Sequence, residues 1–310
     1  MTMNFDLPLA VRQRALTLGQ AGEQWLESLP STVSHLQNLW QLRVLEALQG
    51  GSASLVLNVE TASGAPAVLK IGLEPLGEEA RVLELTAGRG YAKLHGYDES
   101  SNALLLEKLG QPVADLGLPV LDQLRLICNT LSVAWVPMNE ASHFATGAQK
   151  AEWLAESIAA NWIAQDKPCS KAVIDLATRF TEARAQAHRA ADCVLVHGDP
   201  HNYNTLQVPD DQETEVCKLI DPDGLYAEPA YDLGVAIRSW DQYLLSGDAL
   251  QLGIELCQSV AAQTSVDESA IWQWGFIERV STGLHLCELG LHDLGKDMLR
   301  VAEQWSTRNI

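Results

Sequence analysis

Two short loops, each directly behind a short apolar run, constrain this chain more than any other feature of its sequence. The first follows residues 193–196 and reads His-Gly-Asp-Pro-His-Asn-Tyr-Asn over residues 197–204. The second follows residues 216–220 and reads Asp-Pro-Asp-Gly over residues 221–224. Short apolar runs that end in turn formers predict strands. Together the two strand–loop units supply carboxylates and amides on short, turn-rich segments.

These groups are suited to moving a phosphoryl group from Mg-ATP to a hydroxyl. Asp199 is a candidate base, Asn204 lies five residues later as a neutral oxygen ligand for magnesium, and Asp221 is an anionic magnesium ligand. The same spacing, followed by a metal-binding Asp-x-x-Gly, occurs in kinase catalytic loops. We expect His197 to pack the loop through its ring hydrogen bonds, and His201 to orient Asp199 or contact the γ-phosphate.

Other interpretations of the same residues stay open. A metal-dependent hydrolase would use His197, Asp199 and His201 as ligands, although glycine and proline between them prevent the helix that would align two histidines. A kinase-like protein that binds nucleotide without turnover is a second alternative. Asp-Pro-Asp-Gly also suits a type I turn whatever its chemistry.

The type of secondary structure expected along the chain changes near Leu109 and Gly110, from mainly strands to mainly helices. Before it we expect a helix over residues 6–28, strands at 55–59, 67–71, 91–94 and 103–107, and a helix over 76–88. After it, residues 119–190 and 230–305 are mainly helical, interrupted by the two strand–loop units. The sequence therefore predicts a small sheet with a helix, followed by a larger helical part.

The loop at 197–204 resembles that of the aminoglycoside phosphotransferase family of protein-kinase-like enzymes. Residues 220–224 and 228–233 are similar to the streptomycin 6-phosphotransferase and hydroxyurea-resistance branch, and the resemblance gives Asp232 the task of bracing the catalytic loop. It implies an α+β, protein-kinase-like, two-lobed fold with nucleotide between the lobes. Residues 1–108 would form the β-rich nucleotide-binding lobe with leading helices, and 109–310 the helical lobe with catalytic loop and acceptor site.

The same resemblance implies the contacts to ATP. Lys70, in Ala-Val-Leu-Lys, would neutralise phosphates and be held by Glu79, with Glu78 as the alternative. A glycine–serine loop would cover the phosphates, and backbone groups at the end of the lobe would bind adenine. The residues expected in these two segments are Gly50, Gly51, Ser52 and Ser54 for the loop, and Glu107 and Leu109 for adenine.

The composition and net charge limit the kinds of partner that the protein is expected to bind. The net charge of −19 argues against a nucleic-acid or anionic-membrane surface. No apolar run suits a membrane span, no secretory signal is visible, and the six cysteines are scattered, so we expect a cytoplasmic protein with reduced thiols. The acidity favours a cationic small-molecule acceptor, although it also serves solubility alone.

The acceptor expected from the resemblance is an aminoglycoside such as streptomycin, with hydroxyurea or a cellular metabolite as the alternative. Carboxylates of the helical lobe would receive its amino or guanidino groups, and tryptophans would line a floor. Each of these side chains is also explained by a solvated helix face or a core position. They are Asp241, Asp248, Glu278, Glu288, Asp293 and Asp297, with Trp240, Trp272 and Trp274.

Overall fold

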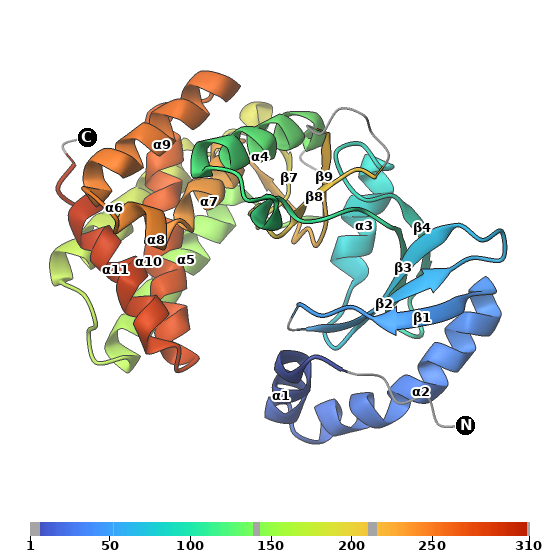
Figure 1. Cartoon of the computed structure of the whole chain (residues 1–310). Coiled ribbons are helices and arrows are strands. Elements are labelled where there is room, and N and C mark those ends of the chain that lie inside the picture. The colour runs from blue at the N-terminus through green and yellow to red at the C-terminus, as the bar shows by residue number, and fades with distance from the viewer. Residues whose placement is uncertain (1–6, 52, 139–142, 210–215, 309–310) are drawn as a thin grey trace. The chain divides into compact units, whose positions relative to one another are not determined.

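The computed structural model describes residues 7–51, 53–138, 143–209 and 216–308. The chain forms two compact units, Met1–Leu109 and Gly110–Ile310 (Figure 1). Each unit buries apolar side chains of its own. Within the described residues, no helix is both long and apolar enough to cross a membrane.

The first unit is built on a five-stranded antiparallel sheet with the order β1-β2-β3-β5-β4. Two helices precede the sheet and one helix is inserted after its third strand (Figure 1). The strands are β1 (Arg43–Ala47), β2 (Ser54–Glu60), β3 (Pro66–Gly72), β4 (Leu94–Asp98) and β5 (Ala103–Glu107), and the helices are α1 (Leu9–Thr17), α2 (Gln20–Trp40) and α3 (Gly77–Thr86).

Alternation along the strands gives this sheet two covered faces. Leu55, Leu57 and Val59 of β2 are buried in one cluster with Leu29 and Val33 of α2, as expected when side chains of a strand alternate in direction. Lys70 of β3 contacts α3. The sheet therefore lies between α2 and α3, as Figure 1 shows.

The beginning of the chain differs from the single helix expected over residues 6–28. The helix breaks at Gly19, whose φ of 58° suits glycine, and α2 then continues through Pro30 to Trp40. Burial of Leu29 and Val33 on either side of this proline stabilises the helix against the loss of one backbone hydrogen bond. The strand expected at 91–94 instead runs from Leu94 to Asp98.

The second unit is mainly helical, and α10 lies at its centre, packed against α5, α6, α7 and α11 (Figure 1). Its long helices are α4 (Val120–Ala134), α5 (Gly147–Ala164), α6 (Lys171–Ala187), α7 (Ala230–Arg238), α9 (Ala249–Thr264), α10 (Glu268–Glu288) and α11 (His292–Trp305). Shorter helical segments are η1 (Val113–Leu116), η2 (Ala190–Asp192) and α8 (Asp241–Leu244).

Two small antiparallel sheets carry the loops singled out above. One has the order β10-β7-β6 and the other pairs β8 with β9. Their strands are β6 (Val136–Pro137), β7 (Val194–Val196), β8 (Thr205–Gln207), β9 (Cys217–Leu219) and β10 (Leu225–Ala227).

Close packing of α7 on α10 fixes the helix that follows these sheets. Gly234 of α7 and Gly275 of α10 meet at this contact. A Cβ added at Gly234 would lie 2.5 Å from the Cβ of Trp274, so only glycine allows this approach. The position of α7 relative to α10 is therefore set by backbone contact, and both helices contribute to the site described next.

Candidate active site

The loop after β7 is held by the carboxylate of Asp232, at the beginning of α7. Its Oδ2 accepts hydrogen bonds from the His197 amide and the Trp135 indole, both at 2.9 Å, and Oδ1 accepts from the Gly198 amide at 2.9 Å. Asp232 is fully buried. Burial raises the pKa of its carboxyl, while His197 and the N–H donors oppose the rise. The expected brace of the catalytic loop by Asp232 is thus present as a set of contacts.

His197 packs the loop through both ring nitrogens, as expected from the sequence. Its Nε2 lies 2.8 Å from the Ile220 carbonyl oxygen, and Nδ1 accepts a hydrogen bond from the Asp199 amide at 3.1 Å. A buried ring engaged in this way has no nitrogen left for a metal. In the described part of the chain, no group of three His, Cys, Asp or Glu side chains is placed to hold a metal ion. This use of both ring nitrogens favours the packing role of His197 over the interpretation in which it is a metal ligand.

Asp199, the predicted base, is held by two neighbours. The Nη2 of Arg238 donates to its Oδ1 at 2.7 Å, and the Nε2 of His201 lies 3.5 Å from its Oδ2. The Tyr203 amide donates to Nδ1 of His201, which leaves the ring proton on Nε2, facing Asp199. Burial acts to raise the pKa of Asp199, but the hydrogen bond from His201 and the charge of Arg238 outweigh it and hold that pKa well below its usual range.

The two predicted magnesium ligands lie at one end of the β8–β9 pair. Thr205 pairs with Leu219, and the Ile220 amide donates to the Asn204 carbonyl oxygen at 3.0 Å. Asp221 follows directly, with a left-handed φ of 56°. The Nδ2 of Asn204 donates to the Asp199 carbonyl oxygen at 3.2 Å, so its Oδ1 is the amide atom left to act as a ligand. The strand pairing thus brings together two residues seventeen positions apart.

In the first unit, Lys70 and Glu79 form the contact expected between β3 and α3. The Nζ of Lys70 lies 2.6 Å from Oε2 of Glu79, and each side chain is only 9% exposed. A buried ammonium needs such a partner, because an isolated charge in an apolar environment is strongly unfavourable. The contact fixes the end of Lys70 at the surface of α3.

The remaining residues expected at the nucleotide are spread over two segments of the first unit. Gly50 and Gly51 lie between β1 and β2 with φ of 114° and 73°, conformations that favour glycine. Ser52 lies outside the described residues, and Ser54 begins β2. At the end of β5, the Glu107 amide donates to the Lys93 carbonyl oxygen, so this amide is already used within the sheet. Leu109 is buried.

Glu278 and two of the tryptophans expected at the acceptor lie in buried positions, as the alternative of a core position predicts. Glu278 is 5% exposed and bonded to Tyr231 and Arg238, while Trp272 and Trp274 are buried in the core. Other candidate carboxylates are engaged locally. Asp241 pairs with Arg279, Glu288 with His285 and Asp297 with Arg300, and Asp248 caps α9.

Arg238 is a residue at this site that the sequence analysis missed. It joins Asp199 to Glu278, and its side chain is 13% exposed. The sequence feature that could have pointed to Arg238 is its position at the end of the otherwise apolar α7. It lies two helical turns after Tyr231 and therefore on the same face of the helix. Helical periodicity predicts that face but not the partner of the arginine.

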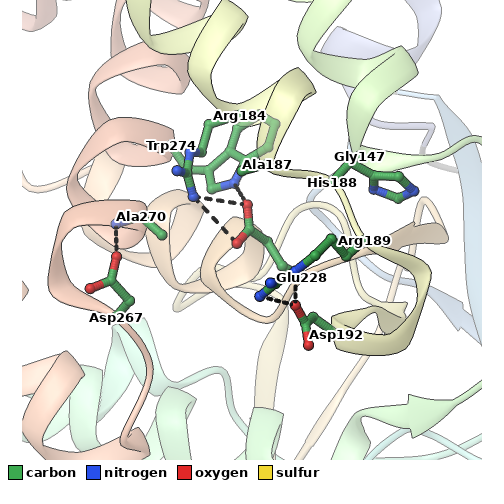
Figure 2. Close-up of a pocket in the computed structure, with 10 residues that line it drawn as sticks. All are labelled: Gly147, Arg184, Ala187, His188, Arg189, Asp192, Glu228, Asp267, Ala270 and Trp274. Carbon is green, nitrogen blue, oxygen red and sulfur yellow. Dashed lines mark hydrogen bonds and ion pairs between the residues drawn. The ribbon is translucent and has the colours of Figure 1, made fainter.

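A cavity of about 310 Å³ lies elsewhere in the second unit (Figure 2). Among the residues that line it are Asp192, just before β7, and Glu228, just after β10. Asp199 lies beyond the other end of β7. Figure 2 shows Glu228 bonded by Arg184 and by the indole of Trp274. The cavity is therefore distinct from the residues predicted for chemistry, and its network anchors the segment that leads into α7.

Comparison with known proteins gives one family and several relatives. A family model described as aminoglycoside/hydroxyurea antibiotic resistance kinase matches residues 40–289. A streptomycin 6-kinase of Streptomyces griseus is 26% identical over 296 residues, covering 92% of each chain. A hydroxyurea phosphotransferase of Kitasatospora aureofaciens is 37% identical over 93 residues, which cover 29% of this chain and 27% of that protein.

Solved structures show the fold. An aminoglycoside phosphotransferase of Streptomyces rimosus, in complex with ADP and streptomycin, superposes with a TM-score of 0.53 at 15% identity. The match covers 82% of this chain and 98% of that one. The expected protein-kinase-like α+β fold, with a small β-rich lobe and a larger helical lobe, is thereby confirmed.

Proposed function

Because the chain belongs to the aminoglycoside/hydroxyurea antibiotic resistance kinase family, we propose that it transfers the γ-phosphate of Mg-ATP to a hydroxyl of a streptomycin-like aminoglycoside. The chain is a small-molecule phosphotransferase, as its curated relatives are. The choice of acceptor rests on the match to a streptomycin 6-kinase over 92% of both chains. The net charge of −19 favours a cationic acceptor in addition.

In this reaction Asp199 orients the acceptor. Its carboxylate accepts a hydrogen bond from the attacking hydroxyl and aligns the oxygen with the γ-phosphorus. As the new O–P bond forms, the bond from the γ-phosphorus to the β,γ-bridging oxygen breaks and ADP leaves, and the proton of the hydroxyl passes to the carboxylate. The low pKa of Asp199, which the His201 hydrogen bond and Arg238 produce, keeps the group ionised in the resting enzyme. Phosphoryl transfer depends mainly on positioning and charge stabilisation, which suits a well-held, weakly basic carboxylate.

Asn204 and Asp221 fit a magnesium ion, because this ion prefers oxygen ligands from carboxylates, amides and phosphates. The hydrogen bond from Asn204 Nδ2 to the Asp199 carbonyl orients the amide so that Oδ1 serves as ligand. Magnesium would supply positive charge at the phosphates when bound. Lys70, clamped by Glu79, gives a fixed ammonium to the α- and β-phosphates, and the backbone at Gly50 and Gly51 supplies N–H donors.

We expect Asn204→Ala and Asp221→Ala to weaken binding of Mg-ATP while nearly sparing metal-free ATP. Each substitution removes one oxygen ligand and leaves the nucleotide contacts of the first unit unchanged. Titration of ATP with and without Mg²⁺ measures the difference. Asn202→Ala is the matched control, because it removes an amide of the same loop that is bonded to Gln123. Unchanged magnesium dependence in both ligand variants would show that these residues do not bind the metal.

The acceptor is tested by ATP consumption with streptomycin, other aminoglycosides, hydroxyurea and small metabolites, with mass spectrometry of the product. We expect phosphorylated streptomycin as the main product. If attraction by the acidic protein assists capture, kcat/KM for the cationic acceptor falls as salt rises while kcat changes little. A neutral or anionic molecule as the best acceptor would contradict the proposed specificity but not the phosphoryl transfer.

Hydroxyurea is the second candidate acceptor. The relative that acts on it has the higher identity, 37%, but over a segment that covers 29% of this chain. Hydroxyurea is neutral, so its kcat/KM would show no salt dependence from acceptor attraction. The same assay therefore separates the two acceptors by product and by salt response.

A further inference from the structure

Behind Asp199, a chain of polar side chains extends into the core of the second unit. Arg238 donates from Nη2 to Oδ1 of Asp199 at 2.7 Å and from Nη1 to Oε2 of Glu278 at 3.4 Å. The hydroxyl of Tyr231 donates to the other oxygen of Glu278, Oε1, at 2.6 Å. Arg238 thus gives one amine to each of two carboxylates.

An arginine that faces a single carboxylate does not usually share its hydrogen bonds in this way. A guanidinium and a carboxylate commonly pair through two parallel hydrogen bonds, which would occupy both oxygens of Asp199. Here Oδ2 of Asp199 meets only Nε2 of His201, at 3.5 Å, among the described residues. The second carboxylate, Glu278, thus takes the Nη1 group that would complete a paired contact of Arg238 with Asp199.

Burial makes the arrangement stiff. Tyr231 is 1% exposed and Glu278 5%. Charged groups at such depth need their partners, since an unpaired buried charge is strongly unfavourable. Burial and the negative charge of Glu278 raise the pKa of Tyr231 well above its usual value, so its hydroxyl keeps its proton and remains a donor to Glu278.

The backbone supports the same geometry. Tyr231 and Arg238 lie two turns apart on α7, with Gly234 between them on the same face. On α10, Glu278 lies one turn after Gly275, and the two glycines form the close contact between the helices. The distance from Glu278 to Arg238 is therefore set by the packing of α7 on α10.

We propose that Glu278 and Tyr231 are positioning residues for phosphoryl transfer, which act by holding Arg238 in its divided arrangement so that Asp199 binds the acceptor hydroxyl through Oδ2. This inference rests on the proposed function of Asp199. In this proposal Glu278 sets the orientation of the Asp199 carboxylate without itself contacting the nucleotide or the acceptor.

The test begins with Glu278→Gln, which keeps the size of the side chain and removes its charge. Arg238 is then drawn to Asp199 alone, and kcat should fall about 10- to 100-fold, the range expected for small displacements of a catalytic group. The KM for ATP should not change. Tyr231→Phe removes the hydroxyl that orients Glu278 and should lower kcat in the same manner but less.

Tyr226→Phe is the matched control for loss of a buried hydroxyl. Tyr226, on β10, is 2% exposed and donates to the Ala190 carbonyl oxygen at 2.6 Å, with no bond to Glu278 or Arg238. We expect it to lower the melting temperature about as much as Tyr231→Phe while leaving kcat close to that of the unmodified protein. Equal losses of kcat in the two tyrosine variants would mean that the effect of Tyr231 is one of stability alone.

A double-mutant cycle separates this inference from the function on which it rests. If Glu278 acts through Asp199, then Glu278→Gln should have no further effect on the residual kcat of Asp199→Asn. A full additional loss in that background would overturn the positioning role while leaving Asp199 as the orienting group. Unmodified turnover in Asp199→Asn alone would instead overturn the proposed function of Asp199.

Discussion

Asp199→Asn should retain nucleotide binding and lose most turnover, with kcat lowered roughly 10²- to 10⁴-fold. Asparagine keeps the shape of the side chain, and its oxygen can still accept from Arg238. It cannot take up the proton of the acceptor hydroxyl, and its NH₂ group donates where the carboxylate accepts. Nucleotide binding is expected to persist because Lys70, Asn204 and Asp221 are unchanged. Steady-state kinetics and nucleotide titration measure the two quantities separately.

Asp192→Asn is the matched control for this substitution. Asp192 ends η2, at the opposite end of β7 from Asp199, and its exposed side chain pairs with Arg189. The same loss of charge there should change kcat by little, because exposed ion pairs contribute little and do not contact the acceptor. Retention of full turnover by Asp199→Asn would assign proton transfer to another group.

The parts of the site that lie within one short segment could be predicted from sequence, because the spacing of the residues along the chain already determines which side chains lie close together. In residues 197–204 the aspartate, the histidines and Asn204 are ordered by one loop, whose glycine has a φ of 97° that side chains disfavour. The contact of Lys70 with Glu79 was also predictable, since a strand and the helix after it are joined by a short connection. The roles of these residues in binding and catalysis stay predictions.

What sequence reasoning missed depends on contacts between distant segments. Arg238 meets Glu278 only because α7 packs on α10 through Gly234 and Gly275, and no periodicity within one helix contains that information. Glu278 was consequently assigned to the acceptor. Trp135 was not singled out, although its indole binds Asp232, because its position just before β6 carries no motif.

Asp232 holds the backbone of the loop at residues 197–198 and the side chain of Trp135 through one buried carboxylate. It accepts three hydrogen bonds, from the amides of His197 and Gly198 and from the indole of Trp135. Removal of a buried acceptor leaves each donor unsatisfied, at a cost of about 1–3 kcal/mol per group. The donors belong to separate segments, so loss of the carboxylate affects the loop and the end of α4 together.

We therefore expect Asp232→Ala to lower the free energy of unfolding by roughly 3–5 kcal/mol, because three buried donors lose their acceptor. Trp135→Phe should cost less, about 1–2 kcal/mol, because it removes one donor and leaves Asp232 bonded to both amides. Urea unfolding of the two variants measures the difference. Turnover should fall sharply in Asp232→Ala even at temperatures where it is folded, since the amides that fix Asp199 lose their anchor. A stable Asp232→Ala variant with unmodified kcat would show that Gly198 and His197 hold the loop without it.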